Sequence, residues 1–289
     1  MYHVFIINPI SGNKNGLKAA KIIEDYCVEN KLLFKIIYTN SNNNAQEIAS
    51  YYKNNKNVII YSVGGDGTLN EVINGMHDGI ANLSIIPTGT GNDFYKCVKK
   101  FNGNKIDLGK VNDKYFINIA SIGFDAEVAN LANTYKEKNL PNKLVYILSL
   151  IKNYFSYKNI EVRSNERKKC ITIFTVCNGS YYGGGFKINP NAKLDSGLFD
   201  IVEADSLNKL QILNLLTKLA KSNHLTDKKI NYYNTDNISI ESNIPLICNV
   251  DGEIIKDNKF NFIIKKQAIE YKQLDNNLKN KLLLKKIIK

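Results

Sequence analysis

Apolar residues in the first hundred positions occur as short continuous runs that alternate with helically spaced segments. A continuous apolar run bounded by turn residues is typical of a strand buried on both faces. Apolar positions three or four residues apart are typical of a helix that covers a sheet. The pattern predicts a parallel sheet with helices on both faces. The predicted strands are 2–7, 32–39, 57–63 and 83–87, and the predicted helices are 16–30, 44–54 and 68–76.

The pattern changes after about residue 110. A strand begins near 115, a helical stretch covers roughly 125–155, and short alternating segments separated by turn residues follow, with one helix at about 206–224. Short alternating strands are typical of an antiparallel sandwich or barrel-like domain. We therefore expect an α/β domain at 1–114 and a β-rich domain at 115–269.

Two apolar segments leave alternatives open. The tail 270–289 ends in "NNLKNKLLLKKIIK", where lysines and apolar residues interleave. It either packs back on the first domain or lies on an anionic membrane with its lysines outward. The stretch 144–155 could contact acyl chains, but we favour a core helix because core packing alone explains its composition.

Charge and cysteine usage narrow the class of protein. The formal net charge of +12 would suit nucleic acid, an anionic membrane or phosphorylated substrates. The lysines are spread along the chain and no basic motif interleaved with aromatics exists, so we do not expect nucleic-acid binding. Five scattered cysteines without a CxxC pair indicate a reducing compartment, and three distant histidines argue against zinc.

The N-terminal segment lacks the pattern of a signal peptide, and no stretch reaches the ~18–20 apolar residues of a membrane-spanning helix. We expect a cytoplasmic protein whose contact with membranes would be peripheral.

Three glycine-rich or polar turns follow predicted strands, at 8–12, 64–68 and 87–92. Because the carboxyl ends of parallel strands meet at one edge of a sheet, we expect these turns to converge on one crevice. Glycine lets backbone N–H groups approach an anion, and a helix start adds further donors. One such turn could be plain turn geometry. Three together favour a phosphate site, with a nucleotide as the natural ligand, although neither GxGxxG nor GxxxxGK[ST] fits.

These motifs carry a family resemblance. The segments 8–12, 64–71 and 87–94, written NPISG, GGDGTLNE and PTGTGNDF, resemble the catalytic domain of diacylglycerol kinases, and most closely its soluble bacterial lipid-kinase branch. That branch is in turn similar to sphingosine kinases. The likeness continues through 122–128, 177–202 and 249–255 and spans nearly the whole chain. GGDGT alone is shared with NAD kinases and, more distantly, phosphofructokinases, so the resemblance implies an α/β domain of that type followed by a lipid-binding β sandwich.

The resemblance implies an ATP-dependent kinase that phosphorylates a lipid hydroxyl at a membrane surface, diacylglycerol first, with Mg²⁺ bridging the phosphates. Asp251 would accept the hydroxyl proton, with Asp66 and Glu253 beside it. Taken alone, Asp251-Gly252 would more simply be a hairpin turn. Magnesium would be held by Asp66, Asp93 and Glu253, directly or through water. The expected nucleotide contacts are Asn8, Ser11, Gly12, Thr39, Gly64, Gly65, Asp66, Gly67, Thr68, Glu71, Gly89, Thr90, Asn92 and Asp93.

The chain departs from the family pattern at two positions. Lys96 stands where the family often has arginine, which keeps the charge but loses bidentate geometry. Ser196 stands where related enzymes tend to carry an aspartate that helps hold a structural Mg²⁺, so a site at Asp195, Ser196 and Leu198 is in doubt. The glycines 183–185 would line the lipid side of the cleft, form a bulge, or simply join two strands.

Other functions stay open at this point. A sphingoid-type or other lipid kinase, an NAD kinase and a non-catalytic lipid or nucleotide sensor share much of the pattern. NAD kinases usually carry a separate Asn-Glu motif, and residues 70–71 lie too close to the glycines to serve as one. A sensor predicts loss of an essential carboxylate, yet all four candidates are present. A homodimer is left open.

Overall fold

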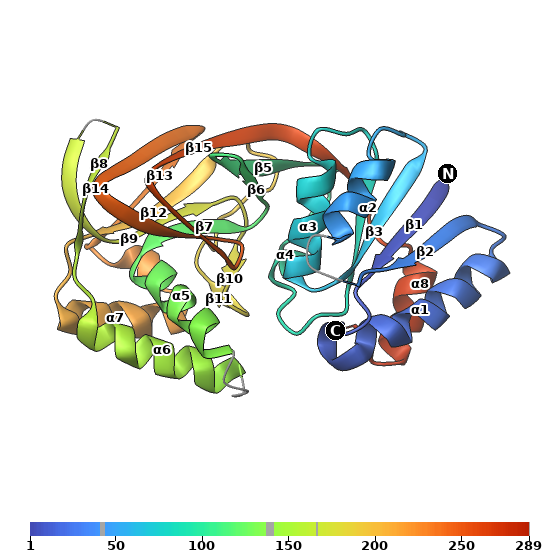
Figure 1. The fold of residues 1–289 in the computed structure, drawn as a ribbon, viewed down its shortest axis with the longest axis horizontal. Coiled ribbons are helices and arrows are strands. Elements are labelled where there is room, and N and C mark those ends of the chain that lie inside the picture. Colours follow the sequence, from blue (N-terminus) through green and yellow to red (C-terminus); the bar gives the residue numbers. More distant parts are fainter. Residues whose placement is uncertain (41–43, 137–141, 166, 289) are drawn as a thin grey trace.

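The computed structural model describes residues 1–40, 44–136, 142–165 and 167–288 (Figure 1). The elements of the first hundred residues are β1 (Tyr2–Ile7), α1 (Ser11–Glu29), β2 (Leu33–Tyr38), α2 (Asn44–Tyr52), β3 (Val58–Gly64), α3 (Asp66–Met76), β4 (Asn82–Pro87) and α4 (Asp93–Val98). Those that follow are β5 (Lys105–Val111), β6 (Lys114–Phe116), β7 (Ile119–Gly123), α5 (Phe124–Lys136), α6 (Asn142–Ser156), β8 (Ile160–Ser164), β9 (Arg167–Cys177), β10 (Tyr181–Tyr182), β11 (Phe186–Lys187), β12 (Phe199–Asp205), α7 (Lys209–Ala220), a 3-10 turn (His224–Thr226), β13 (Ile230–Thr235), β14 (Asn237–Val250), β15 (Glu253–Tyr271) and α8 (Asn276–Leu284).

The predicted parallel sheet is present in the first part of the chain, in the order β4-β3-β1-β2. Helices α1 and α8 pack on one face, where Ile23 and Cys27 share a buried cluster with Leu278 and Leu282. Helices α2, α3 and α4 pack on the other face around a second cluster. The sheet thus has helices on both faces, as the apolar pattern predicted (Figure 1).

Helix α1 begins differently from the prediction, which placed its start at residue 16. It starts at Ser11, but Gly12, Asn13 and Lys14 have φ angles of 55°, 60° and 68°, so regular right-handed helix begins only after them. A side chain at Gly12 would place its Cβ 1.7 Å from the carbonyl oxygen of Thr88. The backbone of the first turn therefore lies directly against that of the third.

The second part of the chain is an antiparallel sheet in the order β13-β12-β9-β7-β14-β15, as predicted for the β-rich region. Its interior is rich in phenylalanine, including Phe116, Phe174 and Phe262. Within the predicted helical stretch 125–155 the structure describes two helices, α5 and α6, and residues 137–141 lie outside the described residues. With α7, these helices cover one side of the strands (Figure 1).

Strand β15 joins the two sheets into one hydrogen-bonded path. It pairs with β14 and β5 along most of its 19 residues, and its last two, Glu270 and Tyr271, pair in parallel with Asn82 and Leu83 of β4. After β15 the chain returns to the first domain. Leu278 and Leu282 of α8 are buried there. The tail therefore packs back on the first domain, which is one of the two arrangements predicted for it.

Within the described residues, no helix has both the length and the apolar character needed to cross a membrane.

Candidate active site

The three turns that follow β1, β3 and β4 converge, as the strand order requires. Asn8 Nδ2 donates to Thr68 Oγ1 at 3.2 Å, and the hydroxyls of Ser11 and Thr88 lie 2.6 Å apart. The carbonyl oxygen of Gly64 accepts the Thr88 amide at 3.0 Å and the following amide at 3.1 Å. The prediction that these turns converge at one sheet edge is therefore confirmed.

Glycine is required where two of these turns touch. A Cβ on Gly89 would lie only 2.4 Å from the Cα of Gly65, a separation that real side chains do not tolerate. Gly65 also precedes α3 and has no side chain with which to cap it, so the first N–H groups of the helix stay open to an anion. The backbone here has the form of a phosphate cradle.

Two carboxylates lie beside this cradle. Asp66 Oδ1 accepts the backbone N–H of Phe94 at 3.2 Å. Burial is the main cause that raises the pKa of Asp66, and the negative charge of Asp93 raises it further. Lys96 Nζ lies 2.7 Å from Asp93 Oδ1 and 5.6 Å from the ring centre of Tyr181. The lysine that departs from the family pattern thus acts as a point charge on Asp93.

The second domain touches this pair through a glycine-rich turn. Gly183, Gly184 and Gly185 join β10 to β11 and all have positive φ. The backbone N–H of Gly184 donates to Asp93 Oδ2 at 2.8 Å. The turn is therefore both a strand connection and a contact between the domains at the site.

Asp251 occupies the tight turn between β14 and β15 with a φ of 49°. Its Oδ1 accepts the backbone N–H groups of Ile119 at 2.9 Å and Asn118 at 3.1 Å. Its Oδ2 accepts the N–H of Ile117 at 2.7 Å and the side-chain amide of Asn70 at 3.4 Å. Burial raises the pKa of Asp251 to about 6, while these four donors act in the opposite direction.

Asn70 places Asp251 next to the nucleotide side of the site. It lies one helical turn after Asp66 on α3, so the two side chains share a face of that helix. Sequence reasoning did not select Asn70 for the site. A sequence signal existed, because Asn70 lies four residues after Asp66 in a predicted helix and so shares its face. In the structure Asn70 is 5% exposed and donates to Asp251.

Other predicted residues have partners away from this cluster. Glu253 pairs with Lys114 at 2.5 Å on the surface. Glu71 Oε2 accepts the backbone N–H of Ala45 at 3.1 Å and so caps α2. Thr90 is exposed, and the backbone N–H of Thr39 donates to the carbonyl of Ile7 at 2.9 Å. Their roles toward ATP stay predictions.

The residues present fit a magnesium ion only in part. In the described ranges no group of three or more His, Cys, Asp or Glu side chains could hold a metal, so Glu253 does not join Asp66 and Asp93 in one cluster. Mg²⁺ commonly binds one or two carboxylates together with substrate phosphates. Asp66 and Asp93 supply two carboxylates beside the phosphate cradle and so fit that donor set, and a cation there would offset the charge of Asp93 that adds to the effect of burial on the pKa of Asp66.

The turn expected to hold a structural cation is closed by its own hydrogen bonds. Ser196 Oγ donates to the carbonyl of Leu198 at 3.0 Å and accepts the Leu198 amide at 3.2 Å. The amide of Gly197 donates to the buried Asp107 at 2.6 Å. These hydrogen bonds engage the Ser196 hydroxyl and one of the two acceptor positions of the Leu198 carbonyl, so the structural metal site at Asp195, Ser196 and Leu198 stays a prediction.

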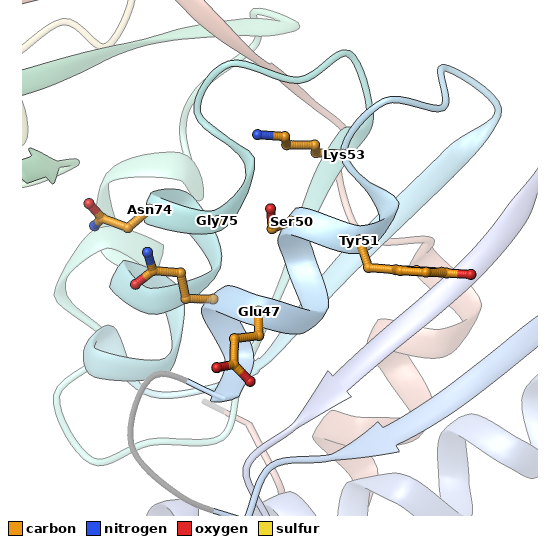
Figure 2. Close-up of a pocket in the computed structure, with 7 residues that line it drawn as sticks. Glu47, Ser50, Tyr51, Lys53, Asn74 and Gly75 are labelled. Atoms are coloured by element: carbon orange, nitrogen blue, oxygen red, sulfur yellow. The ribbon is translucent and has the colours of Figure 1, made fainter.

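A separate cavity of about 630 Å³ lies between α2 and α3. Figure 2 shows the residues around it, with Glu47, Ser50, Tyr51 and Lys53 on the α2 side and Asn74 on α3. None of the residues predicted for the site lines this cavity, so we treat it as distinct from the crevice.

Comparisons with known proteins agree with this geometry. The model of the diacylglycerol kinase catalytic domain matches residues 3–115, and that of the YegS C-terminal NAD kinase beta sandwich-like domain matches residues 118–270. A diacylglycerol kinase of Staphylococcus saprophyticus is 29% identical over 253 residues, 81% of this chain and 82% of the relative. A diacylglycerol kinase of Bacillus subtilis is 30% identical over 215 residues, 68% of this chain and 71% of the relative.

Solved structures agree on the fold. A crystal structure of a diacylglycerol kinase from Bacillus anthracis str. Sterne covers 93% of this chain and 96% of its own, with a TM-score of 0.66 and 18% identity. A second crystal structure from the same organism covers the same shares with a TM-score of 0.74 and 22% identity.

An α/β domain with these turns, joined to this β sandwich, defines a two-domain kinase. The chain belongs to the diacylglycerol kinase family of bacterial lipid kinases, which confirms the resemblance seen in the motifs. The family implies ATP as the phosphate donor and a lipid as the acceptor.

Proposed function

We propose that the protein transfers the γ-phosphoryl group of ATP to the free hydroxyl of diacylglycerol and so produces phosphatidic acid. The names of its relatives support this acceptor. The single observation that carries the proposal is the position of Asp251, a carboxylate from the second domain that meets α3 one turn beyond Asp66. A lipid hydroxyl at Asp251 would thus approach the phosphate cradle from the second domain.

In the proposed reaction the lipid hydroxyl oxygen forms a bond to the γ-phosphorus, and the bond from that phosphorus to the β–γ bridging oxygen breaks. The hydroxyl proton passes to Asp251, and ADP leaves with the bridging oxygen. The open N–H groups at the start of α3 and the glycine turns would hold the phosphates. When bound at Asp66 and Asp93, Mg²⁺ would neutralise charge on the phosphates.

The hydrogen bonds of Asp251 indicate where the hydroxyl would bind. An ionised carboxylate has about four acceptor positions. The backbone N–H groups of Ile117, Asn118 and Ile119 contact the carboxylate at 2.7 to 3.3 Å, whereas the contact from Asn70 is the longest at 3.4 Å. The lipid hydroxyl would therefore replace or share the contact from Asn70, while the backbone donors hold the carboxylate in one orientation.

The test is ADP release with ATP and a panel of diacylglycerol, sphingosine and NAD, with the products identified by mass spectrometry. We expect phosphatidic acid from diacylglycerol. Asp251→Asn should lower kcat about 10²–10⁴-fold, the range of a lost proton acceptor, with little change in the affinity for ATP.

Asp236→Asn is the matched control, because Asp236 is an exposed aspartate in the turn between β13 and β14. It should leave kcat unchanged. Phosphorylation of sphingosine or NAD in preference to diacylglycerol would contradict the acceptor. Full activity of Asp251→Asn would contradict the assigned proton acceptor.

A further inference from the structure

Helices α6 and α7 carry an exposed apolar surface that the core does not require. We call it the α6–α7 face. Its members are 41% to 77% exposed, in contrast to the buried residues of the same helices. They are Leu148, Ile151, Phe155, Leu210 and Leu213.

On α6 the exposed row lies opposite the packed one. Val145, Ser149 and Asn153 are buried at intervals of four, and Asn153 Nδ2 donates to the carbonyl of Phe124 at 2.9 Å. Leu148 and Phe155 belong to the other side of the helix, at the spacing of a second apolar stripe. The expected core role of 144–155 thus explains only one side of this helix.

The exposed residues of the two helices adjoin. Lys209, at the start of α7, donates from Nζ to the carbonyl of Phe155 at 2.9 Å, and its ammonium lies 5.7 Å from the centre of the Phe155 ring. Ile212 and Leu215 of α7 share a core cluster with Leu150 of α6. Figure 1 shows both helices along the lower side of the second domain. Single exposed apolar residues are ordinary, but an adjoining set indicates an interaction surface.

The charged side chains of α6 and α7 are all lysines. Neither α6 nor α7 contains an aspartate or glutamate. Lys152, Lys158 and Lys209 are exposed at or beside the apolar rows. Asp227, near the end of α7, is already paired with Lys218 at 2.8 Å. An apolar surface bordered by lysines, with no acidic residue on either helix, matches the chemistry of an anionic bilayer.

We propose that the α6–α7 face docks the protein on an anionic lipid bilayer. This inference rests on the proposed function, because a kinase of diacylglycerol must reach a substrate dissolved in a membrane. The apolar side chains would enter the boundary between headgroups and acyl chains, and the lysines would extend to the lipid phosphates. The tail offers a smaller apolar surface, at Leu283 and Leu284, because Leu278 and Leu282 of α8 are buried against the first domain.

The test is sedimentation of the full chain with vesicles of phosphatidylcholine alone or mixed with phosphatidylglycerol. The wild type should bind the mixed vesicles. The double variant Phe155→Ser, Leu210→Ser should bind at least about tenfold more weakly, since it lacks two apolar side chains that would enter the bilayer. Lys152→Gln should weaken binding only to the mixed vesicles, by about fivefold.

Two variants serve as controls. Ile80→Ser removes an apolar side chain of similar exposure, 56%, from a loop of the first domain and should bind like the wild type. Leu284→Ser removes the most exposed apolar residue of the tail, at 82%, and should also bind like the wild type. Thermal unfolding of every variant checks folding. If the double variant is unfolded, Leu148→Ser with Leu213→Ser replaces it.

The proposal is overturned if the wild type does not sediment with anionic vesicles, or if Leu284→Ser loses binding and the double variant does not. It is also overturned if sedimentation velocity without lipid shows a dimer that the double variant abolishes, because the face would then bind a second copy. Activity on a short-chain diacylglycerol dissolved in water tests the proposed function separately. If the wild type binds vesicles but does not phosphorylate the short-chain diacylglycerol, the proposed reaction is contradicted and the proposed docking surface is not.

Discussion

The two halves of the candidate site are built in different ways. The first domain contributes glycines and polar side chains at the ends of β1, β3 and β4, where residue type decides how closely the turns approach. The second domain contributes Asp251, fixed by the backbone N–H groups of Ile117 to Ile119. The comparison shows that a motif can define the phosphate side, whereas the acceptor side depends on where the fold places main-chain donors.

The largest expected effect would come from separating the turns of the first half. In Gly89→Ala the new Cβ would meet the Cα of Gly65 at 2.4 Å, so the turns must move apart. We expect ATP to bind at least about tenfold more weakly and the free energy of unfolding to fall by about 1–3 kcal/mol. Isothermal titration with ATP and chemical denaturation measure the two effects.

Gly67→Ala is the matched control for stability, because a Cβ there would meet no atom within 4 Å. Its free energy of unfolding should not fall, since alanine also favours the helix in which it lies. An unchanged ATP affinity in Gly89→Ala would show that the close approach of the turns is unnecessary for binding.

Asp251, the contribution of the second domain to the site, should make kcat/KM depend on pH, and we expect this effect to be of intermediate size. Burial raises the pKa of Asp251 to about 6. Because the carboxylate must be ionised to accept a proton, kcat/KM should fall about tenfold per pH unit below that value and level off above it. A profile from pH 5 to 8 at saturating ATP measures this limb. A flat profile would mean that Asp251 does not titrate in the free enzyme.

The smallest expected effect, that of Asn70→Ala, tests whether Asp251 is the group that titrates. Asn70 donates to Asp251 and lowers its pKa, so Asn70→Ala should move the acidic limb to higher pH and lower kcat a few-fold. The phosphates of ATP also titrate near pH 6, and their contribution is the same in both proteins. If the acidic limb stays at the same pH in Asn70→Ala, the titrating group is ATP and not Asp251.

Much of the first half could be predicted from sequence. Parallel strands bring their carboxyl ends to one edge, so identifying β1, β3 and β4 was enough to predict that their turns converge. Asp66 and Asp93 belong to two of these turns and do lie near each other. The hydrogen bond from Gly184 of the second domain to Asp93 of the first could not be predicted this way, because it depends on how the two domains are placed.

The surroundings of Asp251 in the second domain could not be predicted from the sequence, for a physical reason. The donors to Asp251 are backbone N–H groups, which every residue except proline carries, so no side chain signals their role. Glu253 lies two residues from Asp251 in the sequence yet pairs with Lys114, because the tight turn directs the two side chains to different partners. Strand β13 was not among the predicted strands, because its sequence INYYNT lacks alternation of apolar and polar residues. Strand β5 was missed because a glycine and charged residues interrupt its apolar run.

Strand β15 has a consequence for the order in which the protein is made. Its final residues supply an edge of the first sheet, and α8 then covers α1. The ribosome synthesises these parts only after the whole second domain has emerged. Until the chain beyond residue 270 is free, the first domain therefore lacks this sheet edge and the part of the face that α8 covers. The first domain should consequently reach its final form only after the second domain has been synthesised.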